Sequence, residues 1–180
     1  RRLGLVCNPS AIDRKCRAVS DILNEHFAVS AFFGPEHGIR GDYQNGVTFA
    51  DSVDPNTGKP VYALYGKKAH LTADRLADVD TLVYDIQDVG SRAFSYLRSL
   101  AVLIKDCIEF ERELVVLDRI NPLGGTANEG PLAEPEFDRH WGYGVPLRFG
   151  LTIGEYAKMV NARYFDQRCR LTVIPCANWK

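Results

Sequence analysis

The 180-residue chain is long enough for one domain with a buried core, and its 46% of hydrophobic residues agrees with such a fold. Its 22 Lys and Arg balance 23 Asp and Glu, so it has no net positive field for a nucleic-acid backbone. Nucleic-acid binding is therefore not expected. Membrane insertion is not expected either, because the apolar runs are too short to span a bilayer.

The five cysteines are an odd number and lack the C-x-x-C spacing or His-rich neighbourhood of a zinc site. We interpret most of them as thiols of the core, which favours a reducing compartment. The cysteine pattern therefore predicts no zinc centre, and the sequence gives no indication of the oligomeric state.

The first half of the chain predicts a strand, a helix and a strand in succession. Residues 3–7 and 29–33 are apolar runs of strand length, and residues 14–27 carry apolar side chains at helical spacing. Such a unit implies parallel strands joined by a right-handed crossover. The polar residues 33–59 form a long loop, which we expect to fold over a site.

The rest of the chain continues this alternation. We expect strands at residues 61–65, 80–86, 113–117 and 171–175, and helices at residues 72–76, 94–108 and 152–164. Thr152 and Glu155 match a capping box, so Glu155 is interpreted as structural. The pattern predicts an α/β fold, a Rossmann-like three-layer sandwich with a mostly parallel sheet.

Residues 124–148 are rich in Gly, Pro and aromatic residues and have little periodicity. We expect them to form an extended loop that carries Glu129, His140, Trp141 and Tyr143.

Polar side chains follow four of the expected strands at the point where each strand ends. They are Asn8 after the first, Glu36 and His37 after the second, Asp85, Gln87 and Asp88 at the central strand, and Asp118, Arg119 and Asn121 after the next. The carboxyl ends of parallel strands share one edge of a sheet, where ligands bind at the topological switch point. We therefore expect these segments to converge on one cleft.

The acids permit two kinds of chemistry, which the residues alone do not separate. Dinucleotide, P-loop, G-x-S-x-G and H-E-x-x-H motifs are absent from the sequence. Glu36, Asp85, Asp88 and Asp118 suit either paired-carboxylate catalysis or an oxygen-ligand metal site. Arg92 and Arg119 can clamp a substrate carboxylate, or they can pair with Asp88 and Asp118.

Five separated motifs resemble those of the bacterial exo-β-N-acetylmuramidases of the NamZ type. They are F-G-P-E-H-G-I-R-G-D at 33–42, D-I-Q-D-V-G-S-R at 85–92, L-D-R-I-N-P-L-G-G at 117–125, E-G-P at 129–131 and L-T-I-G-E at 151–155. The match runs through the whole chain in the right order. One departure is Arg148-Phe149-Gly150, where the family pattern leads us to expect R-H-G.

The resemblance implies that residues 1–180 form a Rossmann-like N-terminal catalytic domain and that a smaller C-terminal domain lies outside this chain. It implies release of N-acetylmuramic acid from the non-reducing end of peptidoglycan fragments, with Glu36 of the E-H-G motif as the catalytic residue. It also implies a location in the bacterial cell envelope or outside the cell, whereas the cysteines favour a reducing compartment. The location therefore stays open.

We thus expect a glycosidase without a cofactor, in which Glu36 is the general acid or acid/base. Its partner carboxylate is Asp85, Asp88 or Glu129, and the stereochemistry stays open because it depends on a distance. The expected substrate-binding residues are Asn8, His37, Arg40, Gln87, Arg92, Tyr96, Asp118, Arg119, Asn121, Glu129 and Arg148. The alternatives are a metal-dependent hydrolase that uses the same acids and a non-catalytic saccharide-binding module.

Overall fold

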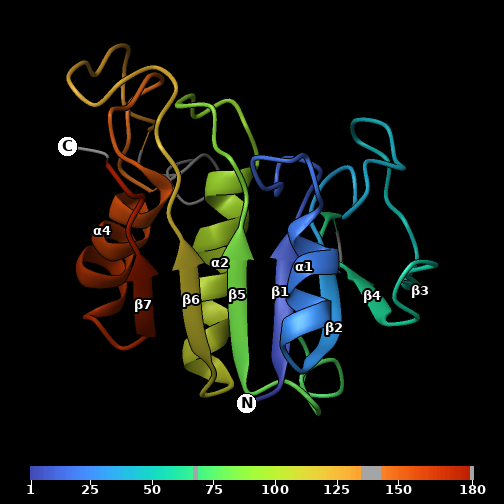
Figure 1. Ribbon diagram of the computed structural model, residues 1–180. Helices are drawn as coiled ribbons and strands as arrows, with labels where there is room; N and C mark the ends of the chain where they lie inside the picture. Colours follow the sequence, from blue (N-terminus) through green and yellow to red (C-terminus); the bar gives the residue numbers. More distant parts are fainter. Residues whose placement is uncertain (67–68, 135–142, 179–180) are drawn as a thin grey trace.

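A computed structural model describes residues 1–66, 69–134 and 143–178, in which seven strands form one sheet (Figure 1). The strands are β1 (Leu3–Cys7), β2 (Val29–Gly34), β3 (Ser52–Val53), β4 (Pro60–Ala63), β5 (Thr81–Asp85), β6 (Glu113–Leu117) and β7 (Arg170–Ile174). Their order is β3-β4-β2-β1-β5-β6-β7, and every pairing is parallel except that of β3 with β4. His140 and Trp141 lie outside the described residues.

The parallel strands have the order of a doubly wound fold. Counted along the chain without β3, they run 3-2-1-4-5-6, so the direction of winding reverses between β1 and β5. The predicted α/β fold with a mostly parallel sheet is therefore confirmed. All six parallel strands point their carboxyl ends to one edge, at the top of Figure 1.

Helices cover both faces of the sheet. The described helices are α1 (Val19–His26), α2 (Tyr96–Glu109) and α4 (Ile153–Phe165). Alternate residues of each strand point to opposite faces, so Leu82 and Tyr84 of β5 join the core under α2 and α4, while Val83 joins the core under α1. Burying such a side chain stabilises the fold by about 1.5–3 kcal/mol. Among the described residues, no helix combines the length and apolar character needed to cross a membrane.

The first helix begins later than predicted. Asp13 Oδ1 accepts hydrogen bonds from the backbone N–H groups of Lys15 (2.8 Å) and Arg17 (3.0 Å), and Cys16 has a left-handed φ of 59°. An aspartate that bonds the backbone ahead of it forms a turn in place of a helix. Helical hydrogen bonding therefore starts at Val19, and the predicted residues 14–18 are not helical.

The predicted helix at residues 72–76 is also wrong, because this segment forms a hydrogen-bonded turn. Arg75 holds the turn: its guanidinium donates to the Ala63 carbonyl (3.1 Å) and to Asp51 (2.8 Å). A single turn of helix has a costly nucleus and is readily displaced by such tertiary contacts. The long loop at residues 33–59, by contrast, contains the short strand β3, which was not predicted.

Candidate functional site

Glu36 lies just beyond the carboxyl end of β2 and accepts three hydrogen bonds. The Ser95 hydroxyl donates to Oε2 (2.7 Å), the Gly46 backbone N–H donates to Oε1 (3.1 Å), and the Tyr65 hydroxyl also donates to the carboxylate. These donors come from the start of α2, the loop at residues 33–59 and the end of β4. Three separate segments thus converge on one carboxylate.

The surroundings of Glu36 favour its ionised form. Partial burial acts to raise the pKa of Glu36, but the hydrogen bonds from Ser95, Tyr65 and Gly46 outweigh it and hold the pKa below its usual value. The hydrogen bond between Tyr65 and Glu36 also raises the pKa of the Tyr65 hydroxyl. Glu36 is therefore a carboxylate at neutral pH.

His37 follows Glu36 with a left-handed φ of 73°, which turns the chain sharply after the strand. Its Nδ1 lies 3.0 Å from the Tyr43 carbonyl oxygen. Because a carbonyl can only accept, Nδ1 carries the proton, and Nε2 has no partner within the described part of the chain. Tyr43 in turn stacks on Phe49 with 4.2 Å between ring centroids, which fixes the carbonyl that orients His37.

A cleft of about 740 Å³ opens over Glu36. It is lined by Glu36, His37, Asn45, Tyr65, Arg92, Ala93, Phe94, Ser95, Tyr96 and Arg98. Among the described residues, Glu36 is the one carboxylate in this lining, and Arg92 and Arg98 are its two arginines. The cleft therefore combines an anion, two cations and several hydroxyl and amide groups at the carboxyl edge of the sheet, as binding sites in this fold do.

Asn8 lies behind the lining of this cleft and contacts Tyr96. Its side chain is hydrogen-bonded to the Tyr96 hydroxyl, and its Oδ1 accepts the Ser10 backbone N–H (3.0 Å). Asn8 is only 6% exposed and does not line the cleft. It positions Tyr96, which does.

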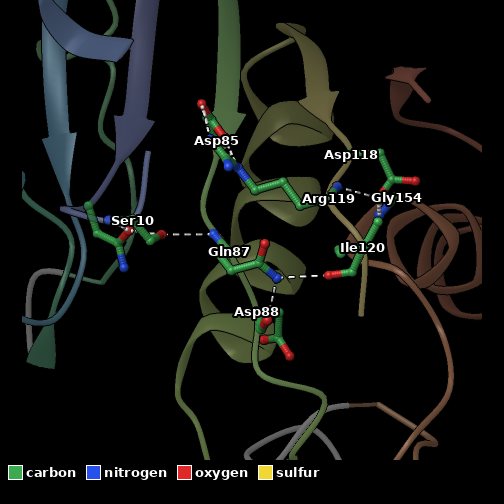
Figure 2. Close-up of polar contacts among 9 residues, drawn as sticks. Ser10, Asp85, Gln87, Asp88, Asp118, Arg119, Ile120 and Gly154 are labelled. Carbon is green, nitrogen blue, oxygen red and sulfur yellow. Dashed lines mark hydrogen bonds and ion pairs between the residues drawn. The ribbon is translucent and has the colours of Figure 1, made fainter. Parts of the chain in front are cut away.

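Asp85 ends β5 and is buried at 2% exposure, as the strand-end pattern predicted. Arg119, in the loop after β6, forms a bidentate ion pair with Asp85, with Nε 2.6 Å from Oδ1 and Nη2 3.1 Å from Oδ2 (Figure 2). Arg119 therefore pairs with Asp85 and not with Asp118. This bidentate contact occupies the edge of the guanidinium that binds carboxylates.

Gln87 joins three of the loops at the carboxyl edge (Figure 2). Its Nε2 donates to the carbonyls of Asp88 (2.6 Å) and Ile120 (2.8 Å), and its backbone N–H donates to the Ser10 hydroxyl (2.9 Å). The loops after β1, β5 and β6 are thereby linked through the backbone and the side chain of one residue. Gln87 acts here as a connector and is not part of the cleft lining.

Asp118 caps the start of α4. Oδ1 accepts the Gly154 backbone N–H (2.7 Å), and Oδ2 accepts the Thr152 hydroxyl (2.8 Å). Thr152 and Glu155 form the predicted capping box, so Glu155 is structural. The carboxylate beside the helix N-terminus adds favourable interaction with the helix dipole.

Asp88 is 6% exposed, and its Oδ2 has no hydrogen-bond partner among the residues described. Burial raises the pKa of Asp88 to about 6, despite backbone N–H donors from Gly90 and Val89. It does not line the cleft over Glu36. Within the described ranges, no three His, Cys, Asp or Glu side chains are grouped to hold a metal ion.

The remaining predicted residues bind other parts of the chain. Arg40 forms ion pairs with Asp54 (2.9 Å) and Asp21 (2.6 Å). Asn121 donates to the carbonyls of Phe149 (2.7 Å) and Leu151 (3.0 Å).

Arg148 pairs with Glu129 (2.8 Å), and both residues belong to loops outside the cleft lining. Arg148 also donates to the Leu123 carbonyl (2.8 Å), so the pair ties neighbouring loops together.

Comparison with known proteins identifies the family of the chain. Residues 3–180 match the family described as "Exo-beta-N-acetylmuramidase NamZ, N-terminal". The chain belongs to the NamZ N-terminal domain family. It is 42% identical over 183 residues to the peptidoglycan beta-N-acetylmuramidase NamZ of Bacillus subtilis (strain 168), which it matches over 100% of its own length and 44% of that protein.

Two crystal structures of DUF1343 family proteins from Bacteroides fragilis NCTC 9343 have the same fold. One superimposes with a TM-score of 0.89 at 39% identity, and the other with a TM-score of 0.76 at 30% identity. Each match covers 99% of this chain but only 46% or 48% of the other. The chain therefore spans less than half the length of the NamZ relatives that it matches.

Four predicted residues of this NamZ domain line the cleft: Glu36, His37, Arg92 and Tyr96. Sequence reasoning missed the other six described residues that line the same cleft, which are Asn45, Tyr65, Ala93, Phe94, Ser95 and Arg98. Tyr65 follows the end of β4, so the strand-end pattern applied to β4 would have found it. Ser95 and Arg98 flank the predicted Tyr96 at the start of α2, where a helix begins beside the carboxyl edge.

Proposed function

We propose that this chain is the catalytic N-terminal part of a glycoside hydrolase that releases N-acetylmuramic acid from the non-reducing end of peptidoglycan fragments. The observation that carries the proposal is Glu36: the carboxylate of the E-H-G motif is held by three donors in a cleft large enough for a sugar. Membership of the NamZ family supports the substrate class.

Glu36 enters the reaction as a carboxylate. Its ionised form suits attack on the anomeric carbon or activation of a water, and its negative charge stabilises the oxocarbenium-like transition state. A Glu36 that acts as an acid must first take up a proton, which becomes easier when substrate displaces one of its hydrogen-bond donors. The acid/base role predicted from the family therefore depends on what substrate does to Ser95 and Tyr65.

The other groups of the cleft suit recognition of a sugar. Tyr96, Tyr65 and Asn45 offer hydroxyl and amide groups for its polar substituents, and Phe94, which is 48% exposed, offers an aromatic surface for its apolar face. Nε2 of His37, which has no partner among the described residues, can accept a hydrogen bond from a sugar hydroxyl. Of the expected partner carboxylates, Asp85 and Glu129 pair with arginines, whereas Asp88 has one oxygen without a partner among the described residues but lies outside the cleft lining.

The test is hydrolysis of a chromogenic β-N-acetylmuramide by the complete protein, beside the matching β-N-acetylglucosaminide. We expect turnover of the muramide, a strong preference over the glucosaminide, and the same rate in the presence of a chelator. Loss of activity in chelator would favour the metal-dependent alternative. Binding of saccharide without turnover would favour the binding module and contradict the proposal.

A further inference from the structure

The side chain of Arg92, one of the two described arginines in the cleft, is held in place by backbone carbonyl groups. Its Nη1 donates to the backbone carbonyls of Pro131 (2.9 Å) and Val145 (2.8 Å), and its own backbone N–H donates to the Leu147 carbonyl (2.9 Å). Two carbonyls on one nitrogen immobilise the guanidinium plane. Because this long side chain is already ordered, ligand binding loses less conformational entropy.

The other edge of this guanidinium binds no described residue. In the described part of the chain, Arg92 forms no ion pair, and its Nε and Nη2 make no hydrogen bond. Nε and Nη2 together form the fork that binds a carboxylate through two parallel hydrogen bonds. Arg92 also does not pair with Asp88. The sequence had left open whether Arg92 pairs with Asp88 or binds a substrate carboxylate.

The same protein shows what this edge of an arginine binds. Arg119 uses Nε and Nη2 to hold the two oxygens of Asp85, at 2.6 and 3.1 Å. Arg40 uses Nε and Nη2 to hold the two oxygens of Asp54, both at 2.9 Å. Arg92 presents the same edge beside the cleft of Glu36, and no carboxylate of the described residues binds to it.

We propose that Arg92 binds the carboxylate of the lactyl ether of N-acetylmuramic acid and so sets the preference of the site for muramic acid over glucosamine. This inference rests on the proposed function. The lactyl group is what distinguishes the two sugars, and its carboxylate is the negative charge that a muramide carries and a glucosaminide lacks. Asp85 already fills the Nε/Nη2 edge of Arg119, and Arg119 is not among the residues that line the cleft.

Arg98 is the second cation of the cleft, and it is placed differently. It is exposed on α2, and no hydrogen bond of its guanidinium ties it to the described residues. An exposed arginine without such anchors attracts anions in general and adds little discrimination. Arg92, with one nitrogen anchored and a fork free, supplies the fixed geometry that discrimination requires.

The experiment compares two substrates on the complete protein: a chromogenic β-N-acetylmuramide with a free lactyl carboxylate, and its lactyl carboxamide. The carboxamide keeps the shape and removes the charge. We expect the unaltered protein to favour the acid by about 30- to 100-fold in kcat/KM, the value of a bidentate charged contact. Arg92→Gln should bring this ratio to within about threefold of one.

Arg92→Lys keeps the charge and loses the second hydrogen bond, so the ratio should fall part of the way, by about tenfold. Arg98→Gln is the matched control in the same cleft and should keep most of the ratio. Circular dichroism of each variant checks that the loops tied by Arg92 still fold.

The outcomes separate this inference from the proposed function. An acid-to-amide ratio near one in the unaltered, active protein overturns the inference without any variant. A ratio that survives in folded Arg92→Gln, or that collapses in Arg98→Gln alone, also overturns it. An unaltered protein that hydrolyses neither substrate contradicts the proposed function itself.

Discussion

The charge of Glu36 depends on two hydroxyl groups that the sequence alone did not single out. Ser95 and Tyr65 donate to the carboxylate, and together with Gly46 they lower its pKa against the effect of burial. Such residues act through Glu36 and are positioning residues. Their contribution should be visible in the pH dependence of the reaction and not only in its rate.

We predict that Ser95→Ala and Tyr65→Phe each shift the acidic limb of the kcat/KM profile to higher pH. Each change removes a hydrogen bond that stabilises the ionised form, so the pKa of Glu36 rises and a higher pH is needed to ionise it. The measurement is the pH profile of muramide hydrolysis by the complete protein. A lower rate with an unmoved acidic limb would show that these hydroxyls do not act through the charge of Glu36.

The ionised form of Asp88 should lower the stability of the folded chain at neutral pH, because this carboxylate is buried. Burial raises its pKa to about 6 from an ordinary value of 3.8, so folding favours the protonated form. The stability that Asp88 contributes is fully present below about pH 4 and is lost as the pH rises through about 6.

We predict that Asp88→Asn raises the free energy of unfolding by about 1–3 kcal/mol at pH 8 and by much less near pH 4. Urea unfolding of both proteins at the two pH values measures the difference. An equal effect at both pH values would contradict a role for its ionisation. Loss of turnover in the stabilised variant would mark Asp88 as part of the machinery.

At the scale of residues, the sequence predicted which edge of the sheet would carry the polar groups but not what each would touch. Asp85 was correctly expected at a rigid strand end, yet its partner Arg119 lies 34 residues away. Spacing along the chain cannot reveal a neighbour contributed by another loop. For the same reason the Ser95 and Tyr65 contacts to Glu36 could not be predicted.

The start of α4 shows how one element holds the edge of the sheet together. Asp118, from the end of β6, accepts hydrogen bonds from both Thr152 and Gly154 at the first turn of α4. A Cβ on Gly154 would lie 2.7 Å from Asp118 Cγ and 2.5 Å from Val173 Cγ1, so the helix can approach the strands this closely only with glycine there.

We predict that Asp118→Ala lowers the free energy of unfolding by about 1–3 kcal/mol, because it leaves the Thr152 hydroxyl and the Gly154 N–H without their acceptor. Asp42→Ala, which changes an exposed aspartate of the long loop, is the control and should stay within about 0.5 kcal/mol. Urea unfolding followed by circular dichroism gives both values. Equal effects of the two changes would argue against the cap.

At the scale of elements, periodicity predicted the buried strands and the long helices well. The errors lie where a tertiary contact outweighs local preference. Asp13 replaces the first turn of the predicted helix with a turn of its own, and Arg75 holds residues 72–76 in a turn. The two-residue strand β3 has no periodic pattern to detect, since its pairing depends on β4.

At the scale of the molecule, the cleft over Glu36 is built at the open edge of one sheet. Glycosidases distort the sugar and exclude bulk water, which requires walls on more than one side. The chain spans 44% of the Bacillus subtilis relative and 46% and 48% of the two Bacteroides structures. We infer that the rest of the complete protein supplies a further wall.

We predict that residues 1–180 alone fold, because the described residues form a seven-stranded sheet with a core on both faces. Their kcat/KM on the muramide should nevertheless be orders of magnitude below that of the complete protein. The comparison uses one substrate and both proteins under the same conditions. Equal values would show that the described cleft is already a complete site.

The most direct test of the central claim is the turnover of Glu36→Gln in the complete protein. Glutamine keeps the size of the side chain and can still accept from Ser95 and Gly46, but it can neither carry the charge nor transfer the proton. Glu25→Gln, on the exposed face of α1, is the matched control. We predict that kcat on the muramide falls roughly 10²- to 10⁴-fold in a folded Glu36→Gln protein and stays unchanged in the control. A folded Glu36→Gln protein with near-normal kcat would contradict the account.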